Sequence, residues 1–231
     1  MTAAALCVVV PLGPDDQAWR TLLPRLSALP ETTELVLSAC AEPPPDWAAL
    51  VDSSPFHSMR WLHTQPGRAQ QLNAGIEASH ASTLWLLHAD SQPNAINLEA
   101  VLDCTTRSQS GWWYFDLQFD GPSSAFVQLN ARGATLRSRW FAQPFGDQGW
   151  VLSREVFEQV GAFDQNWVRG EDLEWTVRAK RIGHTPQALQ SRLITSARRY
   201  REHGWLRTTL RHWLDTLVMN RRARQQIRMC S

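Results

Sequence analysis

Short apolar runs alternate with segments whose apolar residues recur every three or four positions through the first half of the chain. Four runs predict buried strands, at 5–11, 34–39, 59–63 and 83–89. Helical spacing falls between them, at 16–29, 47–51 and 67–79. Strands that alternate with helices predict βαβ units, and near-continuous apolar strands predict a sheet covered by helices on both faces.

The second half of the chain is less regular but carries the same kinds of element. Strands are predicted at 112–119 and 149–153, and helices at 123–141, 154–163, 171–183 and 204–220. The sequence contains no internal repeat, low-complexity segment or clean domain boundary. We therefore expect one α/β domain over residues 1–231, with a mostly parallel, Rossmann-like sheet flanked by helices. Its residues 204–231 are expected to form a basic, amphipathic helical extension.

Hydrophobic residues make up 43% of the 231-residue chain, enough to bury a sizeable core. The formal net charge of +1 gives no indication of a nucleic-acid partner. The charge is unevenly spread, because residues 198–231 contain nine Arg and two acids and so carry +7, against −6 for the rest. A basic end of this kind either contacts phosphates or anionic lipid or is a solvated helix face.

The four cysteines have no close pair, so the sequence contains neither a zinc-site spacing nor a disulfide framework. No apolar run approaches the roughly 20 residues that a membrane-spanning helix needs, and the first residues contain no basic leader. These features predict a reducing, cytoplasmic location.

An acidic residue stands where the fourth predicted strand ends, in the sequence LLHADSQPN at 86–94. Ligands of open α/β sheets bind beyond the carboxyl ends of the strands, and Asp90 lies at such an end. A single carboxylate there can hold Mg²⁺ while leaving room for substrate phosphates. Asp90 can equally cap the local turn by bonding to nearby backbone.

Arg68 lies in the first turn of a predicted helix, where the helix dipole makes a cation unfavourable. The position becomes favourable when an anion, such as a phosphate, lies in front of both the helix end and the guanidinium. The alternative is a solvent-facing Arg with a small energetic cost.

Three further groups are candidates for chemistry. Glu171 and Asp172 open a predicted helix, where acids suit the dipole and where one can also be a general base. Asp147 lies in a Gly-flanked loop, either as a turn residue or as a polar contact to substrate. Arg198 and Arg199 stand together in the sequence ARRY and can grip a diphosphate bidentately.

Taken in order, several stretches resemble family 2 glycosyltransferases of the GT-A fold, and most closely small bacterial members whose metal motif reads His-Ala-Asp. The matching stretches are VVVPLG (8–13), PGRAQQLNAGIEAS (66–79), LWLLHADS (84–91), FGDQGWVLSREVFEQVGAFD (145–164), GEDLEWTVRAKRIG (170–183) and TSARRYREHGWLRTTL (195–210). They span most of the chain up to about residue 210, and their order and spacing carry the likeness.

The resemblance implies an inverting, metal-dependent transfer of a sugar from a nucleotide-diphosphate donor to an acceptor hydroxyl. By position in the motifs, Asp90 would hold Mg²⁺ or Mn²⁺ on the diphosphate, and Asp172 would be the general base. The motif positions that would contact the nucleotide-sugar donor are Pro11, Arg68, Asp90, Asp147, Gln148, Arg198 and Arg199.

Two questions of function stay open in the sequence. The family commonly has an Asp after the second strand, near the base or ribose, but here no acid follows that strand until Glu42. The rival hypothesis is therefore a non-catalytic nucleotide- or nucleotide-sugar-binding protein on the same fold. The second question is the acceptor. Most of the twelve Trp are expected in the core, and the alternative for Trp112 and Trp113 is stacking on a sugar or lipid acceptor.

The segment 204–222 places Trp and Leu on one helical face and Arg on the other. Such a helix either packs its apolar face on its own domain or lies in a membrane interface. In the second case the protein would be peripheral to the inner membrane face, and its acceptor would be lipid-linked or delivered by the membrane.

Overall fold

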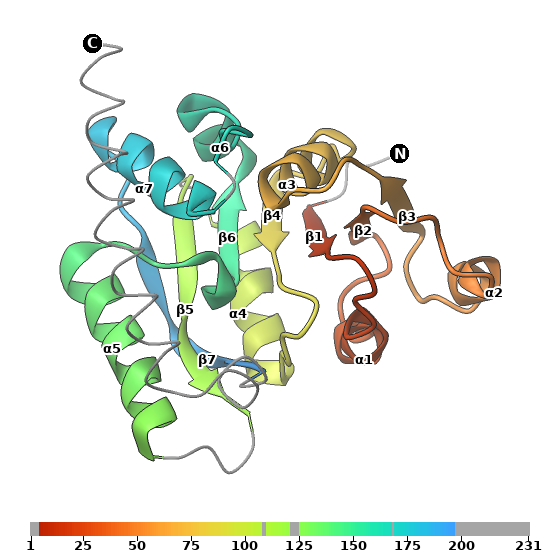
Figure 1. The fold of residues 1–231 in the computed structure, drawn as a ribbon, viewed down its shortest axis with the longest axis horizontal. Helices are drawn as coiled ribbons and strands as arrows, with labels where there is room; N and C mark the ends of the chain where they lie inside the picture. Colours follow the sequence, from red (N-terminus) through yellow and green to blue (C-terminus); the bar gives the residue numbers. More distant parts are fainter. Residues whose placement is uncertain (1–4, 108–109, 121–124, 168, 197–231) are drawn as a thin grey trace.

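The computed structural model describes residues 5–107, 110–120, 125–167 and 169–196 of the chain (Figure 1). The predicted extension at 204–231 lies outside the described residues, as do Arg198 and Arg199. Among the described residues, seven strands form one sheet: β1 (Leu6–Leu12), β2 (Glu34–Ala39), β3 (Ser58–His63), β4 (Thr83–Leu86), β5 (Trp112–Phe119), β6 (Trp150–Ser153) and β7 (Gln187–Thr195).

The order of strands across the sheet is β3-β2-β1-β4-β6-β5-β7. Pairing is parallel from β3 to β4 and between β5 and β7, whereas β6 is antiparallel to both of its neighbours. The carboxyl ends of the six strands that share a direction therefore lie at one edge of the sheet, and β6 begins at that edge.

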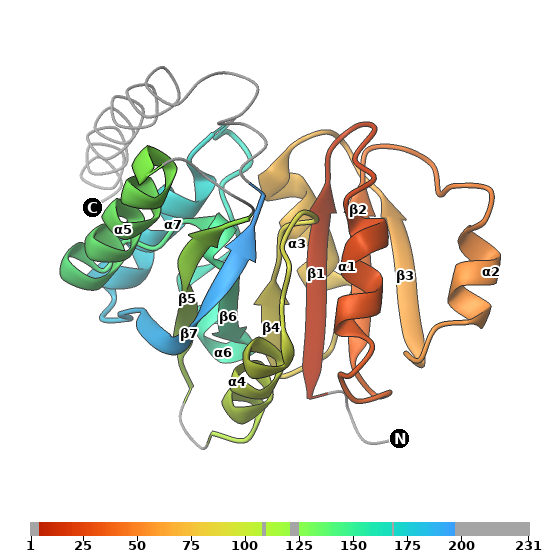
Figure 2. The ribbon, with the colours of Figure 1, turned by 90° about the horizontal axis from the view of Figure 1, so that it is seen from below.

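In the described part of the chain, seven α-helices and one 3₁₀ helix surround the sheet: α1 (Trp19–Leu26), α2 (Trp47–Asp52), α3 (Arg68–Glu77), α4 (Ala95–Thr105), α5 (Ala125–Phe141), η1 (Gly146–Gln148), α6 (Arg154–Val160) and α7 (Glu171–Arg181). Figure 2 shows α1 and α4 on one face of the sheet and α3, α6 and α7 on the other. Among the described helices, none combines the length and hydropathy that crossing a membrane requires.

Each face of the sheet carries its own apolar core. In β1, Val8 and Val10 belong to the core under α1 and α4, and Cys7 and Val9 belong to the core under α3. Successive side chains of a strand point to opposite faces, so a strand covered on both sides must be apolar at every position. This requirement explains the near-continuous apolar runs from which the strands are predicted.

Every strand predicted from these runs is present, and the mostly parallel sheet is confirmed. The first predicted helix is shorter than 16–29, because Asp16 accepts a hydrogen bond from the backbone N–H of Ala18 and α1 begins only at Trp19. The helix contains Pro24 and ends two residues later. Strand β4, predicted at 83–89, also ends earlier than predicted, at Leu86.

The apolar pattern does not predict α4 or β7. Strand β7 lies at the edge of the sheet, and its exposed residues interrupt the apolar run on which a prediction would depend. Helix α4 has a local signal of a different kind, because Asn94 and Asn97 each accept a hydrogen bond from the other's backbone N–H. This reciprocal capping box marks the start of a helix.

We expect Gly75→Ala to destabilise the fold by about 1–3 kcal/mol, the usual cost of overpacking a core. A Cβ at Gly75 would overlap the side chain of Val9 and lie 2.9 Å from Ser38 Oγ, so α3 packs against β1 and β2 without room for a methyl group. Gly133→Ala is the matched control, because nothing lies near that position in α5. The control should gain stability by up to about 1 kcal/mol from helix propensity. Equal denaturation midpoints of the two variants would contradict this packing.

Candidate functional site

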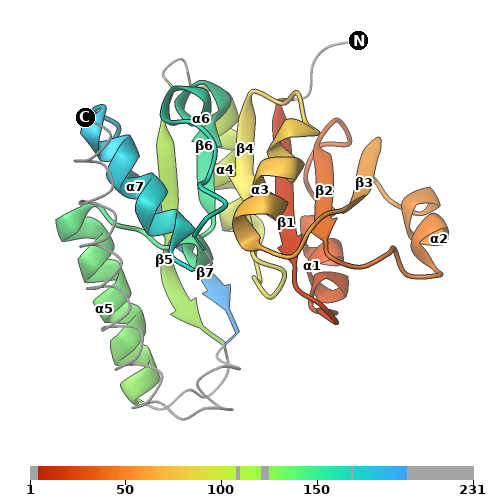
Figure 3. The same cartoon turned by 45° about the horizontal axis from the view of Figure 1, so that its top comes forward.

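The site predicted from the sequence lies at the carboxyl edge of the sheet. Pro11 is the second-last residue of strand β1 and lies beside Ser38 of β2. Arg68 begins α3 immediately after β3, and η1 with Asp147 precedes the start of β6 at the same edge. Figure 3 shows α3 and α7 over one side of this region. The fold therefore brings together segments that lie far apart in the sequence.

The turn after β4 places Asp90 against the end of β7. The backbone N–H of Ser91 donates to the carbonyl of His88, and the N–H of Gln92 donates to the carbonyl of Ile194 at 2.8 Å. The hydroxyl of Thr195 donates to Asp90 Oδ1 at 3.4 Å, and Asp90 itself is half-buried. Asp90 is thus part of a turn, as the turn-cap hypothesis predicts. It also lies beyond a strand end, as the metal-site hypothesis requires.

The surroundings of Asp90 fit a hard cation that shares a substrate's phosphates. The hydroxyl of Ser91 is buried next to Asp90 and has no hydrogen-bond partner among the described residues. Within the same part of the chain no group of three His, Cys, Asp or Glu side chains could hold a metal ion alone. A cation held by one carboxylate completes its coordination with water and phosphate oxygens, as Mg²⁺ commonly does.

Arg68 and Glu171 form a buried ion pair between α3 and α7. Nη1 of Arg68 donates to Oε1 of Glu171, and the two side chains are 25% and 7% exposed. Burial works against the charge of Arg68, but the carboxylates of Glu171, Asp172 and Asp147 outweigh it and raise the pKa of the guanidinium. The anion expected in front of Arg68 is therefore supplied by the protein.

One hydrogen-bond donor of Arg68 has no acceptor among the described residues. Its Nε is buried, and no atom of the described residues accepts its hydrogen. A buried donor without a partner costs about 1–3 kcal/mol, so the group is a ready contact for an oxygen of a ligand. Contact of Arg68 with the donor nucleotide stays a prediction.

The carboxylate of Asp172 is held by two backbone N–H groups. Gly146 donates to Oδ2 and Leu173 donates to Oδ1, each at 2.8 Å. Burial raises the pKa of Asp172 to about 6, and the Glu171 carboxylate adds to the rise while Arg68 and the two N–H groups oppose it. A carboxyl group with a pKa near the operating pH suits proton transfer.

The raised pKa of Asp172 also makes folding depend on pH. The ordinary pKa of the group is 3.8, so the folded protein holds this proton more tightly than the unfolded chain. Its contribution to stability is complete below about 3.8 and is lost as the pH rises through about 6 and the carboxyl ionises.

The loop at 145–149 gives different roles to Gly146, Asp147 and Gln148. A Cβ at Gly146 would overlap the guanidinium of Arg68, so only glycine allows the two to meet. Gln148 is fully buried: its Oε1 accepts from the Ser138 hydroxyl and from the N–H of Phe145, and its Nε2 donates to the carbonyl of Phe115. Gln148 therefore holds the loop, and its predicted contact with the donor would require these bonds to break.

The structure also shows residues that sequence reasoning missed. Gln71, on the buried side of α3, donates from Nε2 to the carbonyls of Leu12 and Ser38 and so fixes the ends of β1 and β2. The sequence signal that could have identified Gln71 is a polar residue on an otherwise apolar helix face. The hypothesis that Trp112 and Trp113 stack on an acceptor is wrong, because both are buried, with exposed fractions of 1% and 4%.

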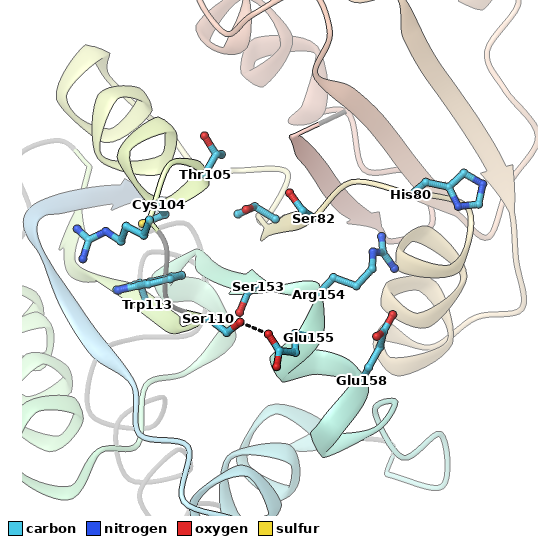
Figure 4. A pocket seen from close by; sticks show the side chains of 12 residues that line it. His80, Ser82, Cys104, Thr105, Ser110, Trp113, Ser153, Arg154, Glu155 and Glu158 are labelled. Carbon is cyan, nitrogen blue, oxygen red and sulfur yellow. Dashed lines mark hydrogen bonds between the residues drawn. The ribbon is translucent and has the colours of Figure 1, made fainter. Parts of the chain in front are cut away.

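A cavity lies at the opposite edge of the sheet, between the start of β4 and the end of β6 (Figure 4). Two of its charged residues, Arg154 and Glu155, have structural partners. Arg154 donates to the carbonyls of Ala81 and Ser79, and the Ser110 hydroxyl donates to Glu155. This cavity is separate from the predicted site.

No protein-family model and no curated protein matches the sequence significantly. Solved structures with the same fold are found at high probability. One is described as the mannosyltransferase PcManGT from Pyrobaculum calidifontis in complex with GDP-Man and Mn²⁺, with a TM-score of 0.64 and 14% identity over 87% of this chain. Another is residues 1–349 of S. aureus TarS in complex with UDP-GlcNAc, with a TM-score of 0.59 and 14% identity over 83% of this chain.

The fold class is thereby confirmed: the chain has a GT-A-like glycosyltransferase fold, a mostly parallel sheet flanked by helices. The chain covers 58% of the length of each of these two structures. An identity of 14% extends the likeness to the fold and not to individual residues.

We expect Glu171→Gln to lower the pKa of Asp172 below its value of about 6, because the substitution removes a like charge beside it. Arg68→Gln should raise the same pKa by removing the opposing cation. The measurement is a pH titration of the aspartate carboxyl carbons by NMR. Asp46, an exposed partner of Arg20, is the internal control whose pKa should stay unchanged. An Asp172 titration that is the same in all three proteins would refute the coupling.

Proposed function

We propose that this protein transfers a sugar from a nucleotide-diphosphate donor to an acceptor hydroxyl, with inversion at the anomeric carbon. The fold supports the reaction class, and the arrangement at the carboxyl edge of the sheet supports the mechanism. The single observation that carries the proposal is the half-buried carboxylate of Asp172, held by two N–H groups and with a pKa raised to about 6. A protein that only binds a nucleotide has no need of a poised base.

In the proposed reaction Asp172 takes the proton of the acceptor hydroxyl. The acceptor oxygen forms a bond to the anomeric carbon as the bond from that carbon to the diphosphate oxygen breaks. The electron pair of the broken bond leaves with the nucleoside diphosphate, and one displacement inverts the anomeric centre. A positioned general base typically contributes 10²–10⁴-fold to such a step.

The negative charge that develops on the leaving diphosphate needs compensation. We propose that Asp90 holds Mg²⁺ or Mn²⁺ there, with the Ser91 hydroxyl and the free Nε of Arg68 as additional polar contacts to the donor. The ion would supply positive charge for the diphosphate oxygens. Pro11, Asp147, Arg198 and Arg199 remain proposed donor contacts, of which the two Arg lie outside the described residues.

The donor can be identified without knowledge of the acceptor. A panel of GDP- and UDP-linked sugars, with and without Mn²⁺, should raise the unfolding temperature for the cognate donor. A ligand at 100 times its dissociation constant adds about 2.7 kcal/mol to stability. Stabilisation by a donor without any turnover in the presence of acceptors would favour the rival, a non-catalytic binding protein.

We expect Asp90→Asn to abolish the Mn²⁺-dependent part of donor stabilisation, because an amide is a much weaker ligand for a hard cation than a carboxylate. The fold should persist, since the amide oxygen can still accept from Thr195. Asp103→Asn, at an exposed position of α4, is the matched control and should bind donor as the wild type does. Full Mn²⁺-dependent stabilisation of the Asp90 variant would exclude this residue as the metal ligand.

Asp172→Asn should bind the cognate donor normally and lose about 100-fold or more in transfer, since an amide cannot accept the proton. In the wild type, transfer should fall about tenfold per pH unit below about pH 6, because the base is protonated there. Release of nucleoside diphosphate measures both effects. Wild-type turnover of the variant would move the search for the base to Glu171 or Asp147.

A further inference from the structure

Large apolar side chains are exposed at five positions of the described residues, and four of these gather at one end of the molecule. Leu136, Trp140 and Phe141 lie on the last turns of α5, and Ile182 follows α7. Their exposed fractions are 52%, 79%, 63% and 53%. We call these four residues the α5–α7 surface. Monomeric soluble proteins expose single apolar residues commonly, but a group of them marks an interaction site.

Helices α5 and α7 are held together at this end. The Lys180 ammonium on α7 donates to the carbonyl of Phe141 at 2.6 Å, so the last turn of α7 lies at the end of α5. Leu136 and Trp140 are four residues apart and so share one face of α5. Ser138, elsewhere on the helix, is buried, and the exposed Arg139 pairs with Asp116 on β5. The α5–α7 surface is thus fixed in place.

Exposed cations flank the α5–α7 surface. The sequence of α5 contains three Arg and no acid. Arg132 on α5 and Arg181 at the end of α7 are exposed. Two acids of neighbouring elements pair with cations of these helices: Asp116 of β5 pairs with Arg139 of α5, and Glu174 pairs with Arg178 within α7. The result is an aromatic surface with a cationic surround.

We propose that the α5–α7 surface binds the face of a bilayer that contains anionic lipids. Exposed Trp and Phe insert at the boundary between headgroups and acyl chains, and Arg and Lys beside them attract anionic headgroups. Self-association fits less well, because a two-fold dimer would place the same cations against one another. This binding does not depend on the proposed reaction.

The test is co-sedimentation of the full-length protein with vesicles of phosphatidylcholine alone or with a third of phosphatidylserine. The wild type should bind the anionic vesicles and lose binding as salt is raised. Trp140→Ser/Phe141→Ser should weaken partitioning by about tenfold or more, since two aromatic side chains no longer leave water. Ile96→Ser is the matched control, an equally exposed apolar residue on α4 (62%) whose loss should have no effect.

Arg132→Gln/Arg181→Gln should weaken binding to anionic vesicles by roughly fivefold per residue, and binding to neutral vesicles not at all. Equal sedimentation of the wild type and the aromatic variant would overturn the proposal. A lower unfolding temperature of the aromatic variant would also overturn it, because these side chains would then be covered by the chain itself. Light scattering that shows a dimer in the wild type and a monomer in this variant would assign the surface to a second copy instead.

Discussion

The ion pair between Arg68 and Glu171 joins α3 to α7 at the candidate site. Its partners are 103 residues apart and open two different helices, α3 and α7. Two charges removed from water pay a desolvation cost of several kcal/mol each, which is recovered only with good geometry and further partners. Asp172 and Asp147 also lie close enough to raise the pKa of Arg68, so three carboxylates, with Glu171, surround one cation.

This constraint has consequences for the neighbouring loop. The guanidinium of Arg68 lies over Gly146, where a methyl group would collide with it. The N–H of Gly146 in turn donates to Asp172, so the position of the proposed base depends on the position of Arg68. The same cation opposes the rise in the pKa of Asp172 that burial and Glu171 produce. Position and proton affinity of one carboxyl group are thus set by the same small network.

Much of the fold could be predicted from the sequence because the sheet is covered on both faces. That geometry demands apolar residues at every position of the central strands, and such runs are visible without any knowledge of long-range contacts. Strand β7 is different, since an edge strand with exposed polar residues leaves no continuous apolar run. Helix α4 was detectable only from the capping pair of Asn94 and Asn97, a signal that apolar periodicity does not contain.

In the candidate site, Asp172 begins α7 and is held by the N–H of Gly146, a position that no strand end predicts. Strand-end topology was sufficient to place Asp90 after β4 and Arg68 after β3 at one edge, because parallel strands end together. It was not sufficient to pair the charges. The sequence places an anion in front of Arg68 but cannot say whether that anion is a phosphate or Glu171, since the answer depends on how α7 packs against α3. Gln148 likewise looks like a polar loop residue in the sequence, because its partners are set by long-range packing. In the structure its amide forms hydrogen bonds with Ser138, Phe145 and Phe115.

The α5–α7 surface and the candidate site are joined by a short piece of chain. Only residues 142–145 separate Phe141 from Gly146, and Ser138 on α5 donates to Gln148 in the site loop. Helix α7 makes the same connection from the other side, with Asp172 at its start and Lys180 on Phe141 near its end. A bilayer that bound this surface would therefore contact the two elements that hold the proposed base. On the proposed function, an acceptor hydroxyl carried by a lipid would then reach Asp172 along the membrane face instead of from bulk solution.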